Sequence, residues 1–289
     1  MSRPSSTPRR SLGRVATLIV TLVGTLVATS PSVGATTIRT SSEGVSATLT
    51  FTGSYPQSHH PWLTISRSAT VIYRQPVTSA WCSSECWPAS SFARQSALHV
   101  VRLGSGVTPS VVLDLYTGGA HCCVVEQVFS VDQKSGRIVK VERNFGDPGA
   151  RLVRLGRTSS FDFVSADDSF AYAFTDYAAS GLPVEVLSFS HHAFHDVTRS
   201  FPTLITRDAL QWQKAFNDAK GSGYQDTVGI VAAWAADEDM LGHFSKVRNF
   251  LNAQLKAGHL NSGLSPIEPG GQRFVVALEK FLRLHHYSN

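Results

Sequence analysis

A strand-and-turn pattern that occurs twice restricts the fold of this chain more than any other feature of its sequence. His99–Gly104 and Arg151–Gly156 both end in Val-Arg-Leu-Gly, so that Leu103 and Leu155 are 52 residues apart. A polar loop and short apolar segments follow each run and predict strands. These strands are expected over 111–116, 124–131 and 138–143 in the first unit and over 161–166, 170–175, 184–189 and 194–197 in the second. A period near 50 with about four short strands is typical of propeller blades or stacked antiparallel meanders.

The segments on either side of these units differ in character. Before them, the alternation of Val45, Ala47, Leu49 and Phe51 predicts a strand. Two more strands are expected over 62–66 and 70–74, and an irregular loop over 77–91. After Pro202 the apolar spacing becomes helical and predicts helices over 207–220, 227–241, 244–257 and 272–285, with Thr206 and Asp226 as N-caps.

These patterns predict an α+β protein, mainly β. Repeated antiparallel meanders, propeller-like or sandwich-like, are followed by a C-terminal helical domain. We expect a secretory signal peptide over residues 1–35, a disulfide-stapled β-repeat domain over 36–202 and a helical domain over 203–289. Three units are too few for an ordinary closed propeller, which favours an open or sandwich-like arrangement.

The expected signal peptide consists of an arginine-rich start and an apolar run over 15–28, followed by the small residues Val33-Gly34-Ala35. The Arg9-Arg10 pair leaves twin-arginine export open beside the general secretory route. Four of the 26 basic residues lie in this leader, which leaves 22 against 21 acidic residues in the mature chain. A nearly neutral mature protein gives no support for a nucleic-acid partner, and no later stretch is long and apolar enough to span a membrane. We therefore expect a secreted, extracytoplasmic protein.

The four cysteines occur as two close pairs, Cys82 with Cys86 and Cys122 with Cys123. Disulfides are expected outside the cytoplasm. Neighbouring residues on a strand point to opposite faces, and adjacent Cα atoms are closer than a relaxed disulfide requires. This favours bridges from the 82–86 loop across to residues 122 and 123, with local pairing as the alternative.

The repeated Val-Arg-Leu runs, each followed by a loop and an apolar strand, resemble the FG-GAP or VCBS type of extracellular β-repeat. That family usually binds calcium through aspartates in its loops. The corresponding loops here, 104–107 and 156–159, contain no carboxylate, so the resemblance implies no calcium site. The run Thr117–Cys123 also resembles one found in uncharacterised secreted bacterial proteins and implies no known activity.

Two groups of residues are candidates for a functional surface. In the first, Asp114, Thr117 and His121 surround the Gly118-Gly119 turn that precedes the paired cysteines. Metal or thiol chemistry at His121 is disfavoured because oxidation removes the thiols. In the second, Asp167 and Asp168 precede the alternating aromatic residues 170, 172 and 174, which places two carboxylates beside Tyr172. An ordinary aspartate turn is the structural alternative.

The sequence contains no nucleophile elbow, zinc-protease motif, phosphate loop or dinucleotide fingerprint. We therefore expect a secreted binding or interaction protein with no cofactor and no metal, and leave open whether it is an enzyme. The expected binding residues are Asp114, Thr117, His121, Asp167, Asp168 and Tyr172. The expected partner is an extracellular protein or a cell-wall polymer. The alternative is a secreted hydrolase that uses Asp167 and Asp168 with His121.

Overall fold

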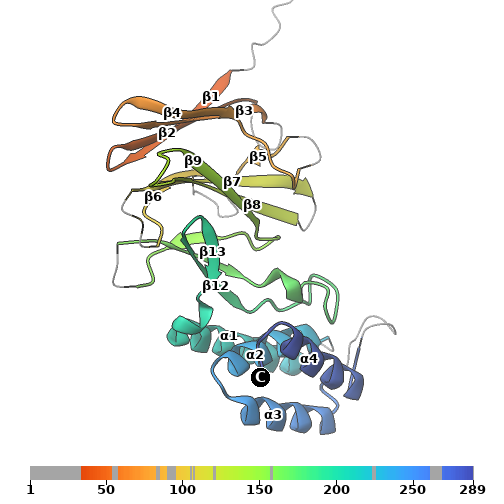
Figure 1. The fold of residues 1–289 in the computed structure, drawn as a ribbon. Helices are drawn as coiled ribbons and strands as arrows, with labels where there is room; N and C mark the ends of the chain where they lie inside the picture. Colours follow the sequence, from red (N-terminus) through yellow and green to blue (C-terminus); the bar gives the residue numbers. More distant parts are fainter. Residues whose placement is uncertain are drawn as a thin grey trace, which may run out of the picture. The chain divides into compact units, whose positions relative to one another are not determined.

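Three antiparallel sheets and four α-helices make up the described part of the chain (Figure 1). The computed structural model describes residues 34–53, 58–82, 85–89, 96–104, 106, 108–119, 122–156, 159–222, 226–260 and 269–288, with the backbone alone at residue 122. The leader expected at residues 1–35 lies almost entirely outside these ranges.

The first sheet is a meander in which each strand pairs with the next along the chain. Its strands are β1 (Ala35–Ser42), β2 (Val45–Thr52), β3 (His59–Arg67) and β4 (Thr70–Pro76). The alternation in β2 buries Val45, Ala47 and Leu49 on one face, as the sequence predicts. β1 was not expected, because its serines and threonines hide the strand pattern; its pairing with β2 along the full length stabilises it.

The second sheet is built on two long strands with both faces buried. Its strands are β5 (Trp87–Pro88), β6 (Leu98–Val101), β7 (Ser110–Gly119), β8 (Cys122–Val131) and β9 (Ile138–Asn144), and both β5 and β6 pair with β7. The third sheet is again a meander, of β10 (Arg151–Val153), β11 (Asp162–Ala166), β12 (Val184–Ser190) and β13 (Ala193–Asp196).

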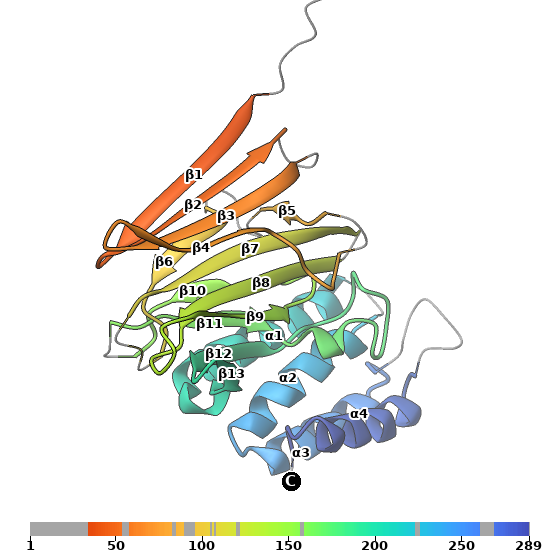
Figure 2. The ribbon, with the colours of Figure 1, turned by 45° about the horizontal axis from the view of Figure 1, so that its top comes forward.

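The sheets and helices lie in successive layers (Figures 1 and 2). Leu113 and Val125 of the second sheet pack with the first sheet in one apolar cluster. Val112 and Val128, whose side chains point to the opposite face of the second sheet, pack with the third sheet in another apolar cluster. The sheets are open, and the part of the chain that the structure describes contains no closed barrel or propeller.

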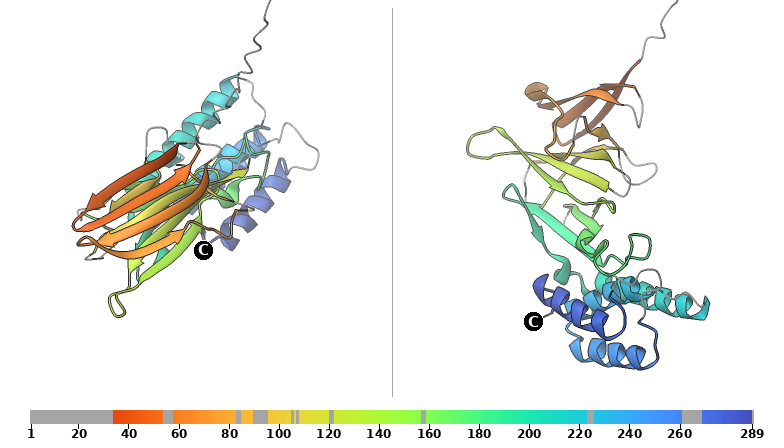
Figure 3. Two further views of the ribbon diagram at one scale, coloured as in Figure 1. Left: turned by 90° about the horizontal axis from the view of Figure 1, so that it is seen from above. Right: turned by 90° about the vertical axis from the view of Figure 1, so that its right-hand side faces the viewer.

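Four helices follow the third sheet, as expected from the sequence. They are α1 (Pro202–Ser222), α2 (Val228–Met240), α3 (Phe244–Lys256) and α4 (Gln272–Leu284). Ile205 of α1 packs on Val184 and Val186 of β12, so the helices cover the outer face of the third sheet (Figure 3). The prediction of Thr206 as an N-cap is wrong: α1 begins at Pro202, and the Thr206 hydroxyl donates to the Pro202 carbonyl inside the first turn.

The strand expected over residues 170–175 is not formed. This segment instead contains the 3₁₀ turn η1 (Asp168–Phe170) and further turns. Phe170 and Phe174 are both buried in the helical core, where their rings pack edge-to-face on Phe281 of α4. The aromatic spacing therefore reflects packing against a helix, and the second unit does not reproduce the strands of the first.

A pair of carboxyl groups, the half-buried Asp208 on α1 and the buried Asp237 on α2, lies where the helices meet the third sheet. The Val184 N–H and the Trp212 indole N–H both donate to Asp208, at 2.9 and 3.0 Å. Asp237 is fully buried, and neither of its carboxyl oxygens accepts a hydrogen bond from a described residue. Burial, together with the neighbouring Asp208 charge, raises the pKa of Asp237 to about 10. Asp237 therefore carries a proton at neutral pH and donates it to Asp208.

Asp237→Asn should stabilise the protein at alkaline pH. Because the folded-state pKa lies above the unfolded value near 3.8, stability falls as the pH rises from about 4 to about 10. One proton contributes at most about 1.4 kcal/mol per pH unit to this slope. Asparagine keeps a donor toward Asp208 but does not titrate. Urea unfolding at pH 5 and pH 8 should show a smaller pH dependence for this variant, and an unchanged dependence in the exposed control Asp218→Asn.

Candidate functional site

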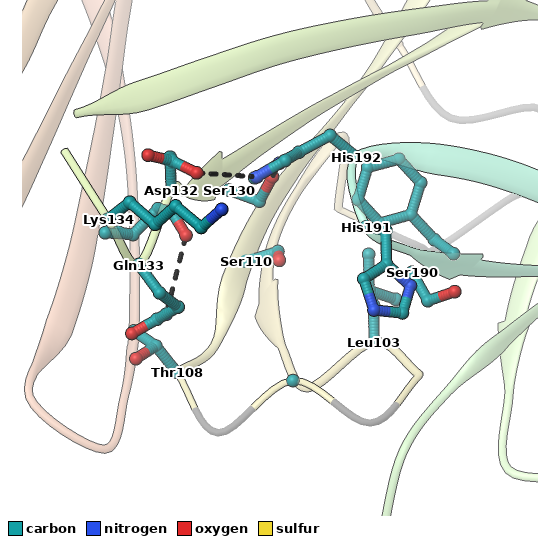
Figure 4. Close-up of a pocket in the computed structure, with 13 residues that line it drawn as sticks. Leu103, Thr108, Ser110, Ser130, Asp132, Gln133, Lys134, Ser190, His191 and His192 are labelled. Atoms are coloured by element: carbon teal, nitrogen blue, oxygen red, sulfur yellow. Dashed lines mark hydrogen bonds and ion pairs between the residues drawn. The ribbon is translucent and has the colours of Figure 1, made fainter. Parts of the chain in front are cut away.

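A pocket of about 440 Å³ opens where the second and third sheets meet at one end. Its lining includes the apolar side chains of Leu103, Val131 and Phe189, together with hydroxyl, imidazole, amide and charged groups, most of which are labelled in Figure 4. Small-molecule sites usually have this combination of apolar surface and a few polar groups.

The first Val-Arg-Leu-Gly run positions one wall of the pocket. Leu103 forms a parallel bridge with Phe161, and Gly104 follows with φ +53°. A Cβ atom on Gly104 would lie 2.4 Å from the carbonyl oxygen of Phe189. Only glycine permits this approach between the two sheets. The repeat signature is therefore a packing feature here, and it holds the end of β12 against the pocket.

The polar side of the pocket is a chain of three side chains, which we call the Ser130–His192–Asp132 group. The Ser130 hydroxyl lies 2.7 Å from Nδ1 of His192, and Nε2 of the same ring lies 3.6 Å from Asp132. Hydrogen bonds from the Ser135 hydroxyl and N–H lower the pKa of Asp132, so this carboxylate is ionised. One of its oxygens holds the turn after β8, and the other faces the imidazole.

His191 and His192 form the two-residue turn between β12 and β13. Both adopt the left-handed conformation, with φ +51° and +60°. Such turns favour Asn-Gly, and each non-glycine residue at positive φ costs on the order of 1 kcal/mol. His191 is exposed, whereas His192 is half-buried and reaches Ser130.

A second polar group lies on the turns that follow β9 and β11, and we call it the tyrosine–aspartate cluster: Asp147, Asp168, Tyr172 and Tyr177. The Tyr177 hydroxyl donates to Asp147, and the N–H of Asp147 donates to Asp168. Partial desolvation and the charges of Asp147 and Asp167 raise the pKa of Asp168. Tyr172 is 61% exposed, has φ +60° and lies against Tyr177, with ring centroids 5.5 Å apart.

The structure separates the two predicted aspartates. Asp167 accepts from the Ser169 N–H at 2.9 Å and from the Tyr287 hydroxyl at 2.7 Å, and so joins the turn to the C-terminal segment. Asp168 packs on Gly146 and belongs to the tyrosine–aspartate cluster. Asp167 therefore has a structural role, whereas Asp168 remains at the surface.

Asp114 and Thr117 lie on β7, away from Asp168. Asp114 is buried opposite Glu126 on β8, and burial next to Asp114 raises the pKa of Glu126 well above its usual range. The Thr117 hydroxyl accepts from the Cys123 N–H at 2.9 Å across the turn. His121 lies outside the described residues.

The expectation that the 82–86 loop is bonded across to residues 122 and 123 is wrong. Cys82 and Cys86 form a disulfide with each other. Cys123 is also disulfide-bonded, and no cysteine is free among the residues described. The local bond closes a short loop whose Cys86 end is buried in the first apolar cluster. Burial of Cys86 in this cluster is a tertiary effect that cysteine spacing does not encode.

Sequence reasoning missed the Ser130–His192–Asp132 group. No spacing along the chain relates His191 and His192 to Ser130. The available signal was the four residues left between the strands expected over 184–189 and 194–197, which predicts a short hairpin loop. Over the described ranges, no three His, Cys, Asp or Glu side chains are placed to hold a metal ion. Nor is any helix there long and apolar enough to cross a membrane.

The chain is similar over about half its length to two curated bacterial proteins. It is 26% identical over 141 residues to a probable thylakoid lumen protein of Synechocystis, which covers 48% of this chain and 41% of the relative. It is 23% identical over 136 residues to an uncharacterized protein of Sinorhizobium fredii, which covers 46% of this chain and 21% of that relative. The chain thus spans less than half the length of either relative. No family model matches it, and no solved structure matches it significantly.

Gly146→Ala should destabilise the protein more than Gly44→Ala does. Both glycines have positive φ, +64° and +79°, so alanine costs on the order of 1 kcal/mol at either position. Nothing lies within 4 Å of a Cβ on Gly44, whereas a Cβ on Gly146 would lie 2.1 Å from Cγ of Asp168. The difference in unfolding free energy measures the cost of displacing Asp168. Removing that side chain with Asp168→Ala in the Gly146→Ala background should reduce the difference; no reduction would contradict this packing.

Proposed function

We propose that this chain is an extracytoplasmic binding protein that recognises a polyhydroxylated polymer of the cell wall through the tyrosine–aspartate cluster. The observation that carries the proposal is Tyr172, an aromatic side chain that is 61% exposed although its backbone has φ +60°. A bulky residue at positive φ is strained, and strain of this kind gathers at functional sites.

The chemistry of the cluster fits such a partner. The ring faces of Tyr172 and Tyr177 can stack on the apolar C–H face of a sugar ring, and the carboxylates of Asp147 and Asp168 can accept hydrogen bonds from its hydroxyl groups. The turns that carry these groups rest on a buried base, because Phe170 and Phe174 anchor them in the helical core. Loops fixed on a rigid scaffold commonly serve recognition.

Three observations support an extracytoplasmic location. The first 35 residues have the pattern of a secretory signal, the Cys82–Cys86 disulfide suits an oxidising compartment, and one relative is a probable thylakoid lumen protein. The proposal thus keeps the mature protein outside the cytoplasm. We also propose that the two 52-residue units are related as β-repeats. The same proposal divides the chain into a β domain that ends at residue 202 and a helical domain that begins at residue 203.

The alternative, a hydrolase that uses Asp167 and Asp168 with His121, has less support. Asp167 is engaged with Tyr287 and Ser169, and Asp168 is engaged with the Asp147 N–H. Asp114, the other carboxylate near the expected site, is buried within the second sheet. These carboxylates do not line one cleft, as an acid–base pair would require.

Tyr172→Gly should weaken binding without loss of stability. Glycine relieves the positive φ and removes the aromatic ring, so the thermal midpoint should stay the same or rise. Retention of the mature protein on purified cell-wall polymer should fall about ten-fold, the equivalent of about 1.4 kcal/mol. Trp62→Ala, which removes a side chain that is 44% exposed on the first sheet, is the matched control and should be retained like wild type. Equal retention of Tyr172→Gly and wild type would show that the cluster is not the binding surface.

A further inference from the structure

The Ser130–His192–Asp132 group lies in a pocket that the proposed binding function does not use. Ser130 is on β8 and its hydroxyl faces the third sheet, where the β12–β13 turn brings His192 against it. We propose that Ser130 is a nucleophile activated by His192, and that this pocket hydrolyses small carboxylic esters.

The hydrogen-bond geometry assigns the protons. The Ser130 hydroxyl can donate to Nδ1 only if the neutral ring carries its proton on Nε2. Nε2 is the nitrogen that faces the ionised Asp132 carboxylate, which favours this tautomer and stabilises the imidazolium formed when Nδ1 takes the serine proton. The 3.6 Å separation from Asp132 is an ion-pair distance, longer than a hydrogen bond. In a serine triad of this kind, His192 is the general base and Asp132 is the carboxylate that orients it. Nδ1 faces the serine and Nε2 faces the carboxylate, which is the reverse of the usual template.

The rest of the pocket suits a small neutral ester. The volume of about 440 Å³ is in the range of small-molecule sites, and Leu103 and Phe189 offer an apolar surface for the acyl or alcohol group. Figure 4 shows Ser110 between the side of the cavity that carries Asp132 and Lys134 and the side that carries His191. The Ser110 hydroxyl and the Lys134 ammonium, which belong to residues that line the pocket, can donate to a carbonyl oxygen that gains negative charge.

The reaction balances without a cofactor. The Ser130 oxygen attacks the ester carbonyl carbon while its proton moves to Nδ1 of His192. The C–O bond to the alcohol breaks, and the departing oxygen takes the proton from Nδ1. Water then attacks the acyl-serine and gives a proton to Nδ1, which returns it to Ser130 as the carboxylic acid leaves. The net change is ester and water to acid and alcohol.

The backbone at this turn supports a functional reason for His192. A glycine at the second position of a two-residue hairpin turn would relieve the strain at φ +60°, whereas histidine maintains it. The imidazole is the group that reaches Ser130. His191 shares this strain but is exposed, whereas His192 also has its side chain against a hydroxyl in a cavity, which points to a role beyond turn formation.

His192→Gly gives a test in which stability and activity move in different directions. The folded mature protein is incubated with a fluorophosphonate probe, which transfers its phosphonyl group to an activated serine with loss of fluoride, and the labelled peptide is identified by mass spectrometry. Wild type should be labelled at Ser130, and Ser130→Ala should lose that label. His192→Gly should be at least as stable as wild type but labelled about 100-fold more slowly, because the general base is gone.

Ala69→Gly is the matched control, because it relieves a positive φ of +68° at the second position of another two-residue hairpin turn, between β3 and β4, and Ala69 does not line the pocket. It should be labelled at the wild-type rate. Absence of the label at Ser130 in folded wild type, or equal labelling of His192→Gly and wild type, would overturn the proposal. Tyr172→Gly should be labelled normally, so that failure of the binding function and failure of this activity are distinguished.

Discussion

Burial of both faces of the second sheet is the constraint on which the remaining structure depends. Along β7 and β8, successive residues enter two different apolar clusters, one shared with the first sheet and one with the third. A polar residue on either strand must therefore find a partner inside the protein or lie where the layers open, because an unpaired buried polar group is costly. Asp114 and Glu126 meet this requirement as a carboxyl pair. Ser130 meets it at the end of the strand, where the pocket opens and its hydroxyl lies 2.7 Å from Nδ1 of His192.

The same constraint explains how polar groups join the layers. Arg143 on β9 reaches across to Glu185 on β12 at 2.8 Å, and burial nevertheless raises the pKa of Glu185 to about 7. The helices are attached to the third sheet by the bond from the Val184 N–H to Asp208, next to the protonated Asp237. These two junctions thus combine an apolar cluster with a small polar group that needs a particular partner. Apolar area supplies most of the stabilisation, whereas the polar groups fix which residues face each other.

The sequence predicts the strands and helices whose pattern follows a single period. The alternation in β2 and the i, i+4 spacing in α4 each reflect one buried face, so the expected elements are confirmed there. The prediction of a strand over residues 170–175 is wrong because Phe170 and Phe174 are buried by helices far along the chain. Alternation within a short segment carries no information about such distant partners. The prediction that the 82–86 loop is bonded across to residues 122 and 123 is wrong for a related reason, because burial of Cys86 against the first sheet is a tertiary contact. Of the candidate residues, Asp168 and Tyr172 do meet in one cluster, because both lie on the same short stretch of turns.

The Ser130–His192–Asp132 group shows why sites between layers are the hardest to read from sequence. Ser130 and His192 are separated by 62 residues. Their meeting depends on the register of β8 in the second sheet, the register of β12 in the third and the stacking of the two sheets. None of these is encoded by the spacing of Ser130 and His192 themselves. What the sequence does record is the local cost of the arrangement: two histidines in a turn that would be relaxed as Asn-Gly. A residue type that is strained in its turn is therefore a better guide to this site than any motif. Selection for folding alone would favour residues that relax the turn.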